Sequence, residues 1–326
     1  MSDATRRRVL QAGIAGLTAS ALPGAAARGQ AAPAAAAPAV NQVERRVLGR
    51  TGAQVGILGL GLGSQFTGPH KDDPEATEAI LTRALAHGCN YFDTARAYGP
   101  SEEMVGGFVK RNRDDIFLVS KSAKRDYDGM KKQIDESLNN LQVESIDLYF
   151  MHNLVKKNAD PAEMEKGCHK ALLEAQEQGL IRHIGLSGHS GPDILMQAIN
   201  RLDPDVLLTI LPCTRPDDGR YETELLPLAI KNNMGVVAMK AVRHAREAAL
   251  KGSELVRYAL SLDGVSTAIV GLDQQAHLDQ NADMASAFVR MTEDERQAMT
   301  TYVNRALAGL PAIWDMPGYE DEVRLA

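Results

Sequence analysis

The feature that most constrains the fold of this chain is a regular alternation of short apolar runs with longer stretches of helical periodicity, from residue 44 to about residue 310. The short runs have the length and composition of buried strands, and they recur eight times. They are Gly56–Leu60, Cys89–Asp93, Ile116–Lys121, Ile146–Met151, Arg182–Ser187, Val206–Leu211, Gly235–Lys240 and Thr267–Val270. The stretches between them place apolar residues three and four positions apart, as in amphipathic helices.

Two of the intervening stretches indicate where their helices end. Residues 74–87 carry apolar side chains at helical spacing, and Gly88 follows where the helix should stop. Residues 161–178 show the same periodicity and are followed by Gly179, which predicts one continuous helix. Glycine favours this position because it adopts the left-handed backbone conformation without strain.

The start of another helix is predicted at Ser101. This residue precedes Glu102 and Glu103, and serine is a preferred N-cap because its hydroxyl accepts a hydrogen bond from a free helix amide. The two acids that follow are favourable at the positive end of the helix dipole. We therefore interpret Ser101 simply as an N-cap and the two acids as residues at the positive end of the helix.

An alternation of strands and helices predicts a parallel sheet, and eight such units predict a closed barrel. The alternative, an open doubly wound sheet that binds a dinucleotide, requires Gly-x-Gly-x-x-Gly after its first strand. Gly59, Gly61 and Gly63 have the wrong last spacing for that motif. Gly-Arg-Thr-Gly at residues 49–52 separates two apolar runs and indicates a hairpin. We expect an α/β protein, a (β/α)8 TIM barrel with an N-terminal β-hairpin, over residues 44–310.

The first 27 residues differ in kind from the rest. A basic start is followed by an apolar run from about Ala12 to Leu22, which is too short to cross a bilayer. The segment Thr5–Gln11, TRRRVLQ, resembles a twin-arginine export signal, and we expect cleavage after Ala27. A disordered alanine-rich tail is the alternative interpretation. The signal implies the Tat export machinery as a partner, a periplasmic or otherwise exported location, and no stable membrane span.

Two further segments flank the predicted barrel. Residues 28–43 are rich in alanine and proline and predict a disordered linker, because they hold no apolar pattern that could build a core. Residues 311–326 form a C-terminal tail with the single tryptophan, Trp314. The tryptophan either folds over the rim of the barrel or packs against its outer helices, and the sequence leaves both open.

Charge and cysteine content exclude several classes of function. The net charge of −6, with no basic block beyond Arg6–Arg8, argues against nucleic acid as a partner. Cys89, Cys168 and Cys213 are far apart in the sequence and form no Cys-x-x-Cys pair, so we expect neither a metal site nor a full disulfide framework. The three thiols are expected to pack as small apolar groups.

Chemically active side chains stand at the ends of three consecutive predicted strands. Asp93 ends one strand and Tyr98 follows it in a Gly-Pro turn, Lys121 ends the next strand, and His152 ends the third. Each residue alone is more often structural: a capping acid, a solvated lysine or a satisfied histidine. However, the C-terminal ends of the strands of a parallel barrel meet at one rim, where active sites form. We therefore predict that the four side chains converge.

This combination suits the reduction of a carbonyl group. Hydride addition leaves negative charge on the oxygen, which must be stabilised and protonated. A phenol gives up its proton reluctantly, but a neighbouring ammonium favours the phenolate and lowers the pKa. We assign Tyr98 as the general acid, Lys121 as the group that tunes it, and Asp93 as the anchor of Lys121. His152 is expected to hydrogen-bond and orient the substrate oxygen.

Several segments resemble the signatures of the aldo-keto reductase family: FDTARAYGPSEEMVG, FLVSK, DLYFMHN, IRHIGLSGHS and AIVGLDQQAHLDQNADMA. The likeness runs from about Arg46 to Ala287. It implies a (β/α)8 barrel that uses NADPH without a Rossmann domain, with the Asp, Tyr, Lys and His named above as catalytic residues. A small-molecule carbonyl or alcohol is the implied substrate.

The resemblance also implies where the cofactor binds. Ser187 stands where the family contacts the nicotinamide amide, and Gly188 replaces an asparagine there. Leu208 and Leu211 stand where the family has a glutamine and a ring-stacking tyrosine, and His277 replaces a common arginine near the 2′-phosphate. The implied cofactor is NADP(H), with NAD(H) as the alternative. The residues implied to bind it are Gly61, Ser187, Gly188, Gly271, Asp273, His277 and Asn281.

The predicted function is that of an exported oxidoreductase that interconverts a carbonyl and an alcohol by hydride transfer with a nicotinamide cofactor. A barrel that binds the cofactor with little turnover, as a sensor or binding protein, is the alternative. Because free NADPH is not expected outside the cytoplasm, we also expect the cofactor to be loaded before export and recycled on the protein.

Overall fold

The computed structural model describes residues 41–189, 191–213, 219–242 and 248–310, which belong to one compact unit. The export signal, nearly all of the linker and the tail with Trp314 lie outside the described residues, so the domain boundaries drawn from the sequence stay predictions. Within the described ranges, no helix is both long and apolar enough to cross a bilayer.

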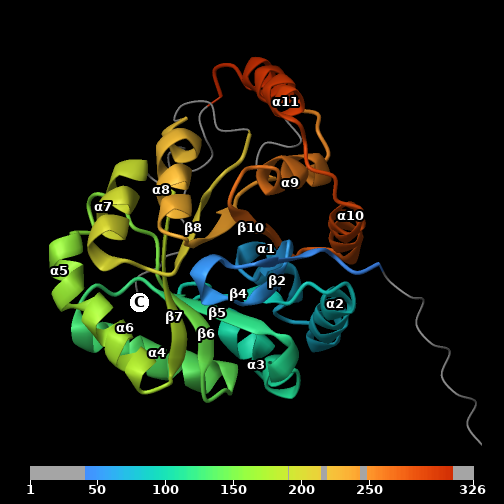
Figure 1. Cartoon of the computed structure of the whole chain (residues 1–326). Helices are drawn as coiled ribbons and strands as arrows, with labels where there is room; N and C mark the ends of the chain where they lie inside the picture. The colour runs from blue at the N-terminus through green and yellow to red at the C-terminus, as the bar shows by residue number, and fades with distance from the viewer. Residues whose placement is uncertain (1–40, 190, 214–218, 243–247, 311–326) are drawn as a thin grey trace, which may run out of the picture. The chain divides into compact units, whose positions relative to one another are not determined.

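Eight parallel strands close into a barrel, with helices around its outside (Figure 1). Hydrogen bonds join the strands in the order β10-β3-β4-β5-β6-β7-β8-β9, so each strand neighbours the next along the chain and the last meets the first. The strands are β3 Leu58–Gly61, β4 Tyr91–Asp93, β5 Phe117–Ser122, β6 Ile146–Met151, β7 Ile181–Gly188, β8 Val206–Ile210, β9 Gly235–Met239 and β10 Val265–Gly271. The predicted fold class and all eight predicted strands are confirmed, with small shifts at the strand ends.

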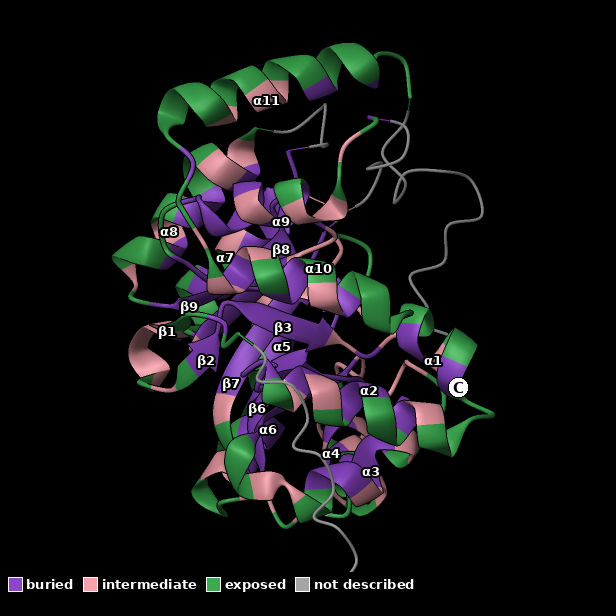
Figure 2. Ribbon diagram, turned by 90° about the vertical axis from the view of Figure 1, so that its right-hand side faces the viewer, coloured by how far each residue is buried: buried purple, intermediate pink, exposed green. Residues whose placement is uncertain are grey.

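Helices alternate with the strands, bury one face against the barrel and expose the other (Figure 2). The sequence sets their ends locally: Asp73 accepts a hydrogen bond from the amide of Ala76 at 2.9 Å and starts α2, and Gly88 follows its end with a φ of 82°. The described α-helices are α1 Ser64–His70, α2 Pro74–Ala86, α3 Ser101–Arg111, α4 Tyr127–Leu141, α5 Pro161–Lys166, α6 Cys168–Glu177, α7 Pro192–Leu202, α8 Leu226–Lys231, α9 Gly252–Leu260, α10 Gln275–Ser286 and α11 Glu293–Ala306.

The helix predicted as continuous over residues 161–178 is in fact two helices. Gly167 separates α5 from α6. A Cβ at this position would come within 2.4 Å of the carbonyl oxygen of Arg125, so the chain must pass close to the loop after β5 here. The apolar periodicity continues across the break, because both helices bury a face against the same barrel, and periodicity alone therefore did not reveal it.

The predicted N-terminal hairpin is present and covers the N-terminal end of the barrel. Strands β1 (Arg45–Val47) and β2 (Gln54–Gly56) pair in antiparallel fashion around a short 3-10 turn. Leu48 and Val55 of the hairpin are fully buried and belong to the same apolar cluster as side chains from inside the barrel. The hairpin therefore plugs the barrel at the end opposite to the predicted active site.

Close contacts fix the hairpin to the strand starts. Gly49 has a φ of 50°, and a Cβ there would lie 2.0 Å from the backbone nitrogen of Gly235, so only glycine fits beneath β9. The guanidinium of Arg50 donates from Nε to Oδ1 of Asp205 at 3.0 Å, just before β8. These contacts join the turn of the hairpin to two neighbouring barrel strands.

The interior of the barrel is packed with side chains and leaves the two ends as places for a site. A single apolar cluster fills it, with aromatic rings from neighbouring strands in contact: the rings of Tyr91 and Phe117 stack with centroids 5.6 Å apart. The strand residues of this cluster are Tyr91, Phe117, Val119, Leu148, Phe150, Val206, Leu208 and Val237.

The three cysteines are free and buried, which confirms the prediction that they pack as small apolar groups. Burial raises the pKa of the Cys89 and Cys213 thiols to about 12 and that of Cys168 to about 11. These thiols are therefore almost wholly protonated at neutral pH.

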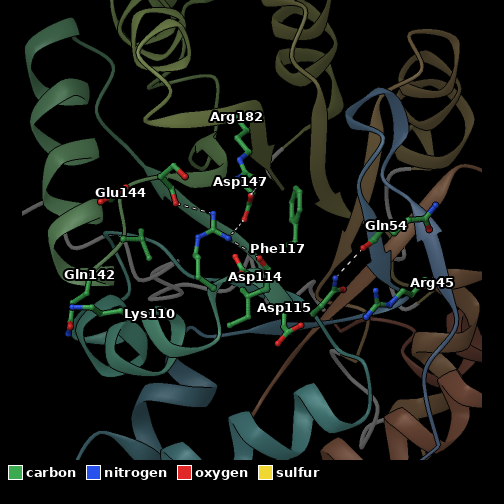
Figure 3. A pocket seen from close by; sticks show the side chains of 15 residues that line it. Arg45, Gln54, Lys110, Asp114, Asp115, Phe117, Gln142, Glu144, Asp147 and Arg182 are labelled. Atoms are coloured by element: carbon green, nitrogen blue, oxygen red, sulfur yellow. Dashed lines mark hydrogen bonds and ion pairs between the residues drawn. The ribbon is translucent and has the colours of Figure 1, made fainter.

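A polar hollow of about 600 Å³ lies at the N-terminal ends of the strands (Figure 3). Asp147, near the start of β6, is buried there and accepts a hydrogen bond from the amide of Leu118 at 2.7 Å. It also pairs with Arg113 at 2.8 Å and with Arg182 at 2.9 Å. The carboxylate is thus satisfied by neighbouring strands and loops, and we interpret the hollow as part of the framework.

Candidate active site

Asp93 and Lys121 form an ion pair inside the C-terminal rim of the barrel. Asp93 ends β4 and pairs with Val119 in the parallel register. Because side chains alternate along a strand, Lys121 points to the same inner face as Val119. Its Nζ lies 2.5 Å from Oδ1 of Asp93 and donates to the carbonyl oxygen of Thr94 at 2.8 Å. Both charged side chains are completely buried.

Burial dominates the electrostatics of this pair. Desolvation raises the pKa of Asp93 above its ordinary value, although the ammonium of Lys121 acts in the opposite direction. The second carboxylate oxygen, Oδ2, is buried and has no hydrogen-bond partner among the described residues. A buried ion pair with an unsatisfied oxygen stabilises a fold poorly, so its position at the rim points to chemistry.

Tyr98 lies in the turn that follows β4. Its amide donates to the carbonyl oxygen of Ala95 at 3.0 Å, and Gly99 takes a φ of 57°, which turns the chain back over the rim. The ring lies beside the ion pair, with Nζ of Lys121 4.8 Å from the ring centroid. The side chain of Tyr98 is partly exposed, so its phenol can meet a substrate from solvent.

His152 follows β6 and is held by its amide, which donates to the carbonyl oxygen of Ser122 at 2.8 Å. Its ring meets the ring of Tyr98 edge to face, with centroids 5.7 Å apart and an angle of 86° between the planes. The imidazole is buried, with 6% of the residue exposed. The structure thus brings together all four side chains that the strand ends predicted.

A second tyrosine, Tyr91, lies two residues before Asp93 on the same strand. Its phenol is completely buried in the packed interior. Burial, with a further contribution from the charge of Asp93, raises its pKa well above the ordinary value. Tyr91 therefore stays protonated and inaccessible, and of these two phenols Tyr98 is the one that can exchange a proton at the rim.

Gly61 and Gly271, both predicted to bind the cofactor, are paired at the ends of β3 and β10. A Cβ on Gly61 would lie 3.0 Å from the carbonyl oxygen of Val270, and one on Gly271 would lie 2.6 Å from Cβ of Gln65 in α1. Close packing of the chain therefore requires small residues here, and this reason does not depend on a ligand.

Ser187 and Gly188 end β7 and hold the loop that follows His152. Oγ of Ser187 accepts a hydrogen bond from the amide of Asn153 at 3.0 Å, and its carbonyl oxygen accepts from the amide of Leu154 at 2.7 Å. A Cβ on Gly188 would lie 2.8 Å from the carbonyl oxygen of Leu154. The hydroxyl of Ser187 keeps its own hydrogen, which it can donate to a ligand.

Asp273, His277 and Asn281 are placed by the end of β10 and by α10. Oδ1 of Asp273 lies 2.8 Å from Nδ1 of His277, one helical turn away, and Asn281 is buried against the barrel. The helix starts at Gln275 and has no side-chain cap, so its first amides are open to an anionic group.

These donors fit a dinucleotide cofactor. The uncapped start of α10 at the C-terminal rim suits an anionic group of a dinucleotide, because helix amides and the helix dipole both favour negative charge. The carboxylate of Asp273, in contrast, opposes an additional phosphate on the adenosine ribose. The residues present therefore fit NAD(H) at least as well as NADP(H).

The two leucines aligned with the cofactor-binding glutamine and tyrosine are both buried. Leu208 lies in the packed barrel interior, and Leu211 lies in the apolar layer between barrel and helices.

Sequence reasoning missed Met239 and Lys240 at the end of β9. Met239 packs on the interior cluster and is partly exposed at the rim, and Lys240 follows with a φ of 59°. Their place at a strand end was the signal that could have identified them.

The prediction that the Ser101 side chain caps α3 is wrong. The helix begins at Ser101 itself without a side-chain cap, and the serine hydroxyl donates to the carbonyl oxygen of Leu62 at 2.6 Å. Glu102 is buried and lies 2.6 Å from the guanidinium of Arg96, whereas Glu103 is exposed. The loop that carries Tyr98 is therefore joined by an ion pair to the start of α3.

Comparison with known proteins adds to this geometry. Residues 57–255, well over half of the chain, match the family model described as the aldo/keto reductase family. L-galactose dehydrogenase of Arabidopsis thaliana is 27% identical over 286 residues, which cover 74% of this chain and 88% of the relative. The aldo-keto reductase yakc of Schizosaccharomyces pombe, whose name specifies NADP(+), is 33% identical over 159 residues, or 44% of each chain.

A solved structure shares the fold. The aldo-keto reductase of Bacillus halodurans, in its holo form, superposes with a TM-score of 0.68 and covers 80% of this chain and 96% of its own. The sequence identity of this pair is 22%, so the likeness shows the barrel architecture and no more.

Proposed function

Because the chain belongs to the aldo/keto reductase family, and is therefore an oxidoreductase of carbonyls and alcohols, we propose that Tyr98 is its general acid and base. The observation that carries this proposal is the position of Lys121, whose ammonium lies between the carboxylate of Asp93 and the ring of Tyr98. A phenol next to a fixed cation gives up its proton more readily than a phenol in water.

Each rim residue then has a distinct role in the reduction of a carbonyl. Tyr98 donates its proton to the substrate oxygen as negative charge develops there. Lys121 stabilises the phenolate that remains, and Asp93 keeps the ammonium charged and fixed in place. His152, at the edge of the phenol ring, donates a hydrogen bond to the same oxygen and orients it. In the oxidation of an alcohol, the phenolate accepts the proton instead.

The proposed cofactor is NADP(H), with NAD(H) as the alternative. A nicotinamide supplies or accepts the hydride when it is bound. The residues that would hold the dinucleotide are the hydroxyl of Ser187 and the start of α10 with Asp273, His277 and Asn281. Met239, at the end of β9, has a partly exposed apolar side chain at the same rim. This side chain would cover the nicotinamide ring.

Replacement of Tyr98 tests the proposed mechanism. Wild-type protein should oxidise a reduced nicotinamide in the presence of some aldehyde or ketone from a broad panel, measured by loss of nicotinamide absorbance. Tyr98→Phe should lower that rate by about 100-fold or more, which is the usual contribution of general acid catalysis. Tyr302→Phe is the matched control, because this tyrosine lies on the outer helix α11.

Two results would contradict the proposal. Undiminished turnover of Tyr98→Phe would remove the role of the phenol. Cofactor binding without turnover across the whole panel would instead indicate a sensor or binding protein.

We further propose that the protein is exported through the twin-arginine pathway. The support is the TRRRVLQ segment with the apolar run behind it, in the part of the chain outside the described residues. Replacement of Arg6 and Arg7 by lysine should leave the protein in the cytoplasm, whereas wild type should appear in the periplasmic fraction. Equal distribution of the two forms after fractionation would refute the assignment.

Export has a consequence for the cofactor. The twin-arginine route carries folded proteins, so we propose that the dinucleotide is bound before export and is recycled on the protein by coupled oxidation and reduction. Gentle purification from the periplasm followed by nucleotide extraction should recover about one dinucleotide per chain, identified by mass spectrometry. An empty site in such material would contradict this proposal without affecting the role of Tyr98.

A further inference from the structure

The loop that leads from β4 to Tyr98 is held against β5. The amide of Thr94 donates to the carbonyl oxygen of Val119, and the amide of Arg96 donates to that of Lys121, each at 3.0 Å. In the opposite direction, the ammonium of Lys121 donates to the carbonyl oxygen of Thr94 at 2.8 Å. The backbone that leads to the phenol therefore rests on the strand that carries the ammonium.

A buried carboxylate reinforces this attachment. Glu102, at the start of α3, is 1% exposed, and its Oε2 accepts from the guanidinium of Arg96 at 2.6 Å. Its Oε1 accepts from the hydroxyl of Ser120, also at 2.6 Å. Ser120 immediately precedes Lys121, and Arg96 lies two residues before Tyr98. The carboxylate of Glu102 thus connects Ser120, the residue next to Lys121, with the loop that carries Tyr98.

Helix α4 completes the network. Glu136 accepts from the second guanidinium nitrogen of Arg96 at 3.1 Å, and the side-chain amide of Asn140 donates to Glu102 at 3.3 Å. The two helices can approach this closely because α3 has Gly106 opposite Asn140, where a Cβ would lie 2.2 Å from the carbonyl oxygen. Burial lowers the pKa of the Arg96 guanidinium, because it disfavours the charged form. The carboxylates of Glu102 and Glu136 together have a larger effect in the opposite direction, so the pKa lies above its usual value.

Such a network is an inefficient way to stabilise a fold. A buried ion pair often contributes less to the free energy of unfolding than apolar side chains of the same volume. Arg111, at the end of α3, also forms an ordinary surface pair with Glu78 of α2, in which both side chains are at least half exposed. The Arg96–Glu102 pair differs because it contacts both segments that position the proton donor.

We propose that Arg96 and Glu102 are positioning residues that set the spacing between the ammonium of Lys121 and the phenol of Tyr98. The inference rests on the proposed function, in which that spacing controls how readily the phenol gives up its proton. In this role both residues act through the loop. Without the bridge, the loop keeps its backbone hydrogen bonds to β5 but loses its side-chain attachment. A small shift of the loop then takes the phenol away from part of the effect of the cation.

The sign of the expected change follows from electrostatics. A cation beside a phenol favours the phenolate and lowers the pKa, so a larger distance raises the pKa of Tyr98. The pH at which alcohol oxidation reaches half its maximum should then move upward. A residue that only stabilised the fold would lower the amount of folded protein and leave this midpoint unchanged.

The test compares Glu102→Gln with Arg111→Gln, which lies on the same helix as Glu102 and breaks the exposed pair with Glu78 of α2. In Glu102→Gln, kcat should fall by about 10- to 100-fold, because a displacement of about 1 Å near a reacting group has effects of this size. KM should change little, and the pH midpoint should rise. Arg111→Gln should match wild type in all three quantities. Arg96→Lys keeps the charge and should retain more activity than Arg96→Gln.

A second readout does not require turnover. The ultraviolet difference spectrum of wild type against Tyr98→Phe reports the ionisation of this phenol alone, and the same titration in a Glu102→Gln background should give a higher pKa. If Glu102→Gln does not fold, Arg96→Gln removes the partly exposed half of the pair and is titrated instead. An unchanged pKa of Tyr98 in the folded variant overturns the inference, even if kcat is lower. Failure of the proposed function would appear separately, as turnover that survives Tyr98→Phe.

Discussion

The ammonium nitrogen of Lys121 lies 2.5 Å from a carboxylate oxygen of Asp93, where neither side chain reaches solvent. Transfer of both charges from water is unfavourable, and their mutual attraction offsets this only with good geometry. The pair is therefore more easily explained by what the ammonium does to the neighbouring phenol than by its contribution to stability. Separate measurements of stability and turnover can distinguish these two roles.

The first prediction concerns this pair. Asp93→Asn should lower the free energy of unfolding by about 3–5 kcal/mol, because it leaves a buried ammonium without its counter-charge. The double variant Asp93→Asn with Lys121→Met removes both charges and should recover much of that loss, yet remain inactive. Urea denaturation and turnover of carbonyl substrates, measured on the same preparations, check the two parts. An active double variant would contradict the role of the ammonium.

The second prediction concerns the thiols. Cys89, Cys168 and Cys213 are buried, and desolvation raises their pKa to about 12, about 11 and about 12. Alkylation requires the thiolate and access to it, so all three should react slowly at neutral pH in the native protein. In denaturant, all three should react at the rate of a small-molecule thiol. Rapid labelling of one cysteine in the folded protein, located by mass spectrometry, would contradict the burial of that thiol.

The third prediction concerns the attachment of the hairpin. Asp205 accepts hydrogen bonds from Arg50 and from the amide of Ile184, each at 3.0 Å. Burial raises its pKa, but hydrogen bonds from His183, from the Ile184 amide and from Arg50 outweigh burial, and the net pKa lies below the ordinary value of 3.8. Asp205→Asn should therefore lower the free energy of unfolding by about 1–3 kcal/mol at neutral pH.

The pH dependence of this effect has a defined sign. A carboxylate whose folded-state pKa is depressed stabilises the fold above its unfolded pKa, and that contribution is lost as pH falls through the lower folded value. The difference between wild type and Asp205→Asn should thus be constant well above pH 3.8 and shrink as the pH falls through and below that value. Urea denaturation over a pH series measures this. Asp263→Asn, which breaks an exposed pair with Arg290, should change stability little.

The parts of the fold that repeat could be predicted from the sequence. Each strand is an apolar run followed by a helix of clear periodicity, and eight such units predict a closed barrel. The ends of the strands are predicted from the positions where the apolar runs stop. Asp93, Lys121 and His152 could be identified because a polar side chain directly after a buried strand of a parallel barrel must lie at the rim. Tyr98 could be identified because it follows Asp93 in a short turn.

The parts that were missed depend on contacts between distant segments. Gly167 breaks a helix because of the carbonyl of Arg125, about 40 residues earlier, and no local pattern encodes this contact. The buried state of Glu102 was in fact signalled, because Glu102 shares one helix face with buried Val105 and Val109. Its charge was given more weight than its position, so it was interpreted only as an acid at the positive end of the helix.

The last prediction concerns the choice between the two nicotinamide dinucleotides. Asp273 lies one turn from His277 at the start of α10, in the segment that the family resemblance assigns to the adenosine ribose. A carboxylate there can accept hydrogen bonds from ribose hydroxyls but repels a 2′-phosphate. Asp273→Ser should therefore tighten NADPH binding by about 10-fold and weaken NADH binding, since about 1–2 kcal/mol is typical of one charge near a partly exposed phosphate. Asp283→Asn, further along the same helix, is the control. Calorimetric titration with both nucleotides measures these changes. A change of equal size and sign for NADH and NADPH would mean that Asp273 acts on the diphosphate rather than on the ribose. No change for either nucleotide would mean that the adenosine end binds elsewhere.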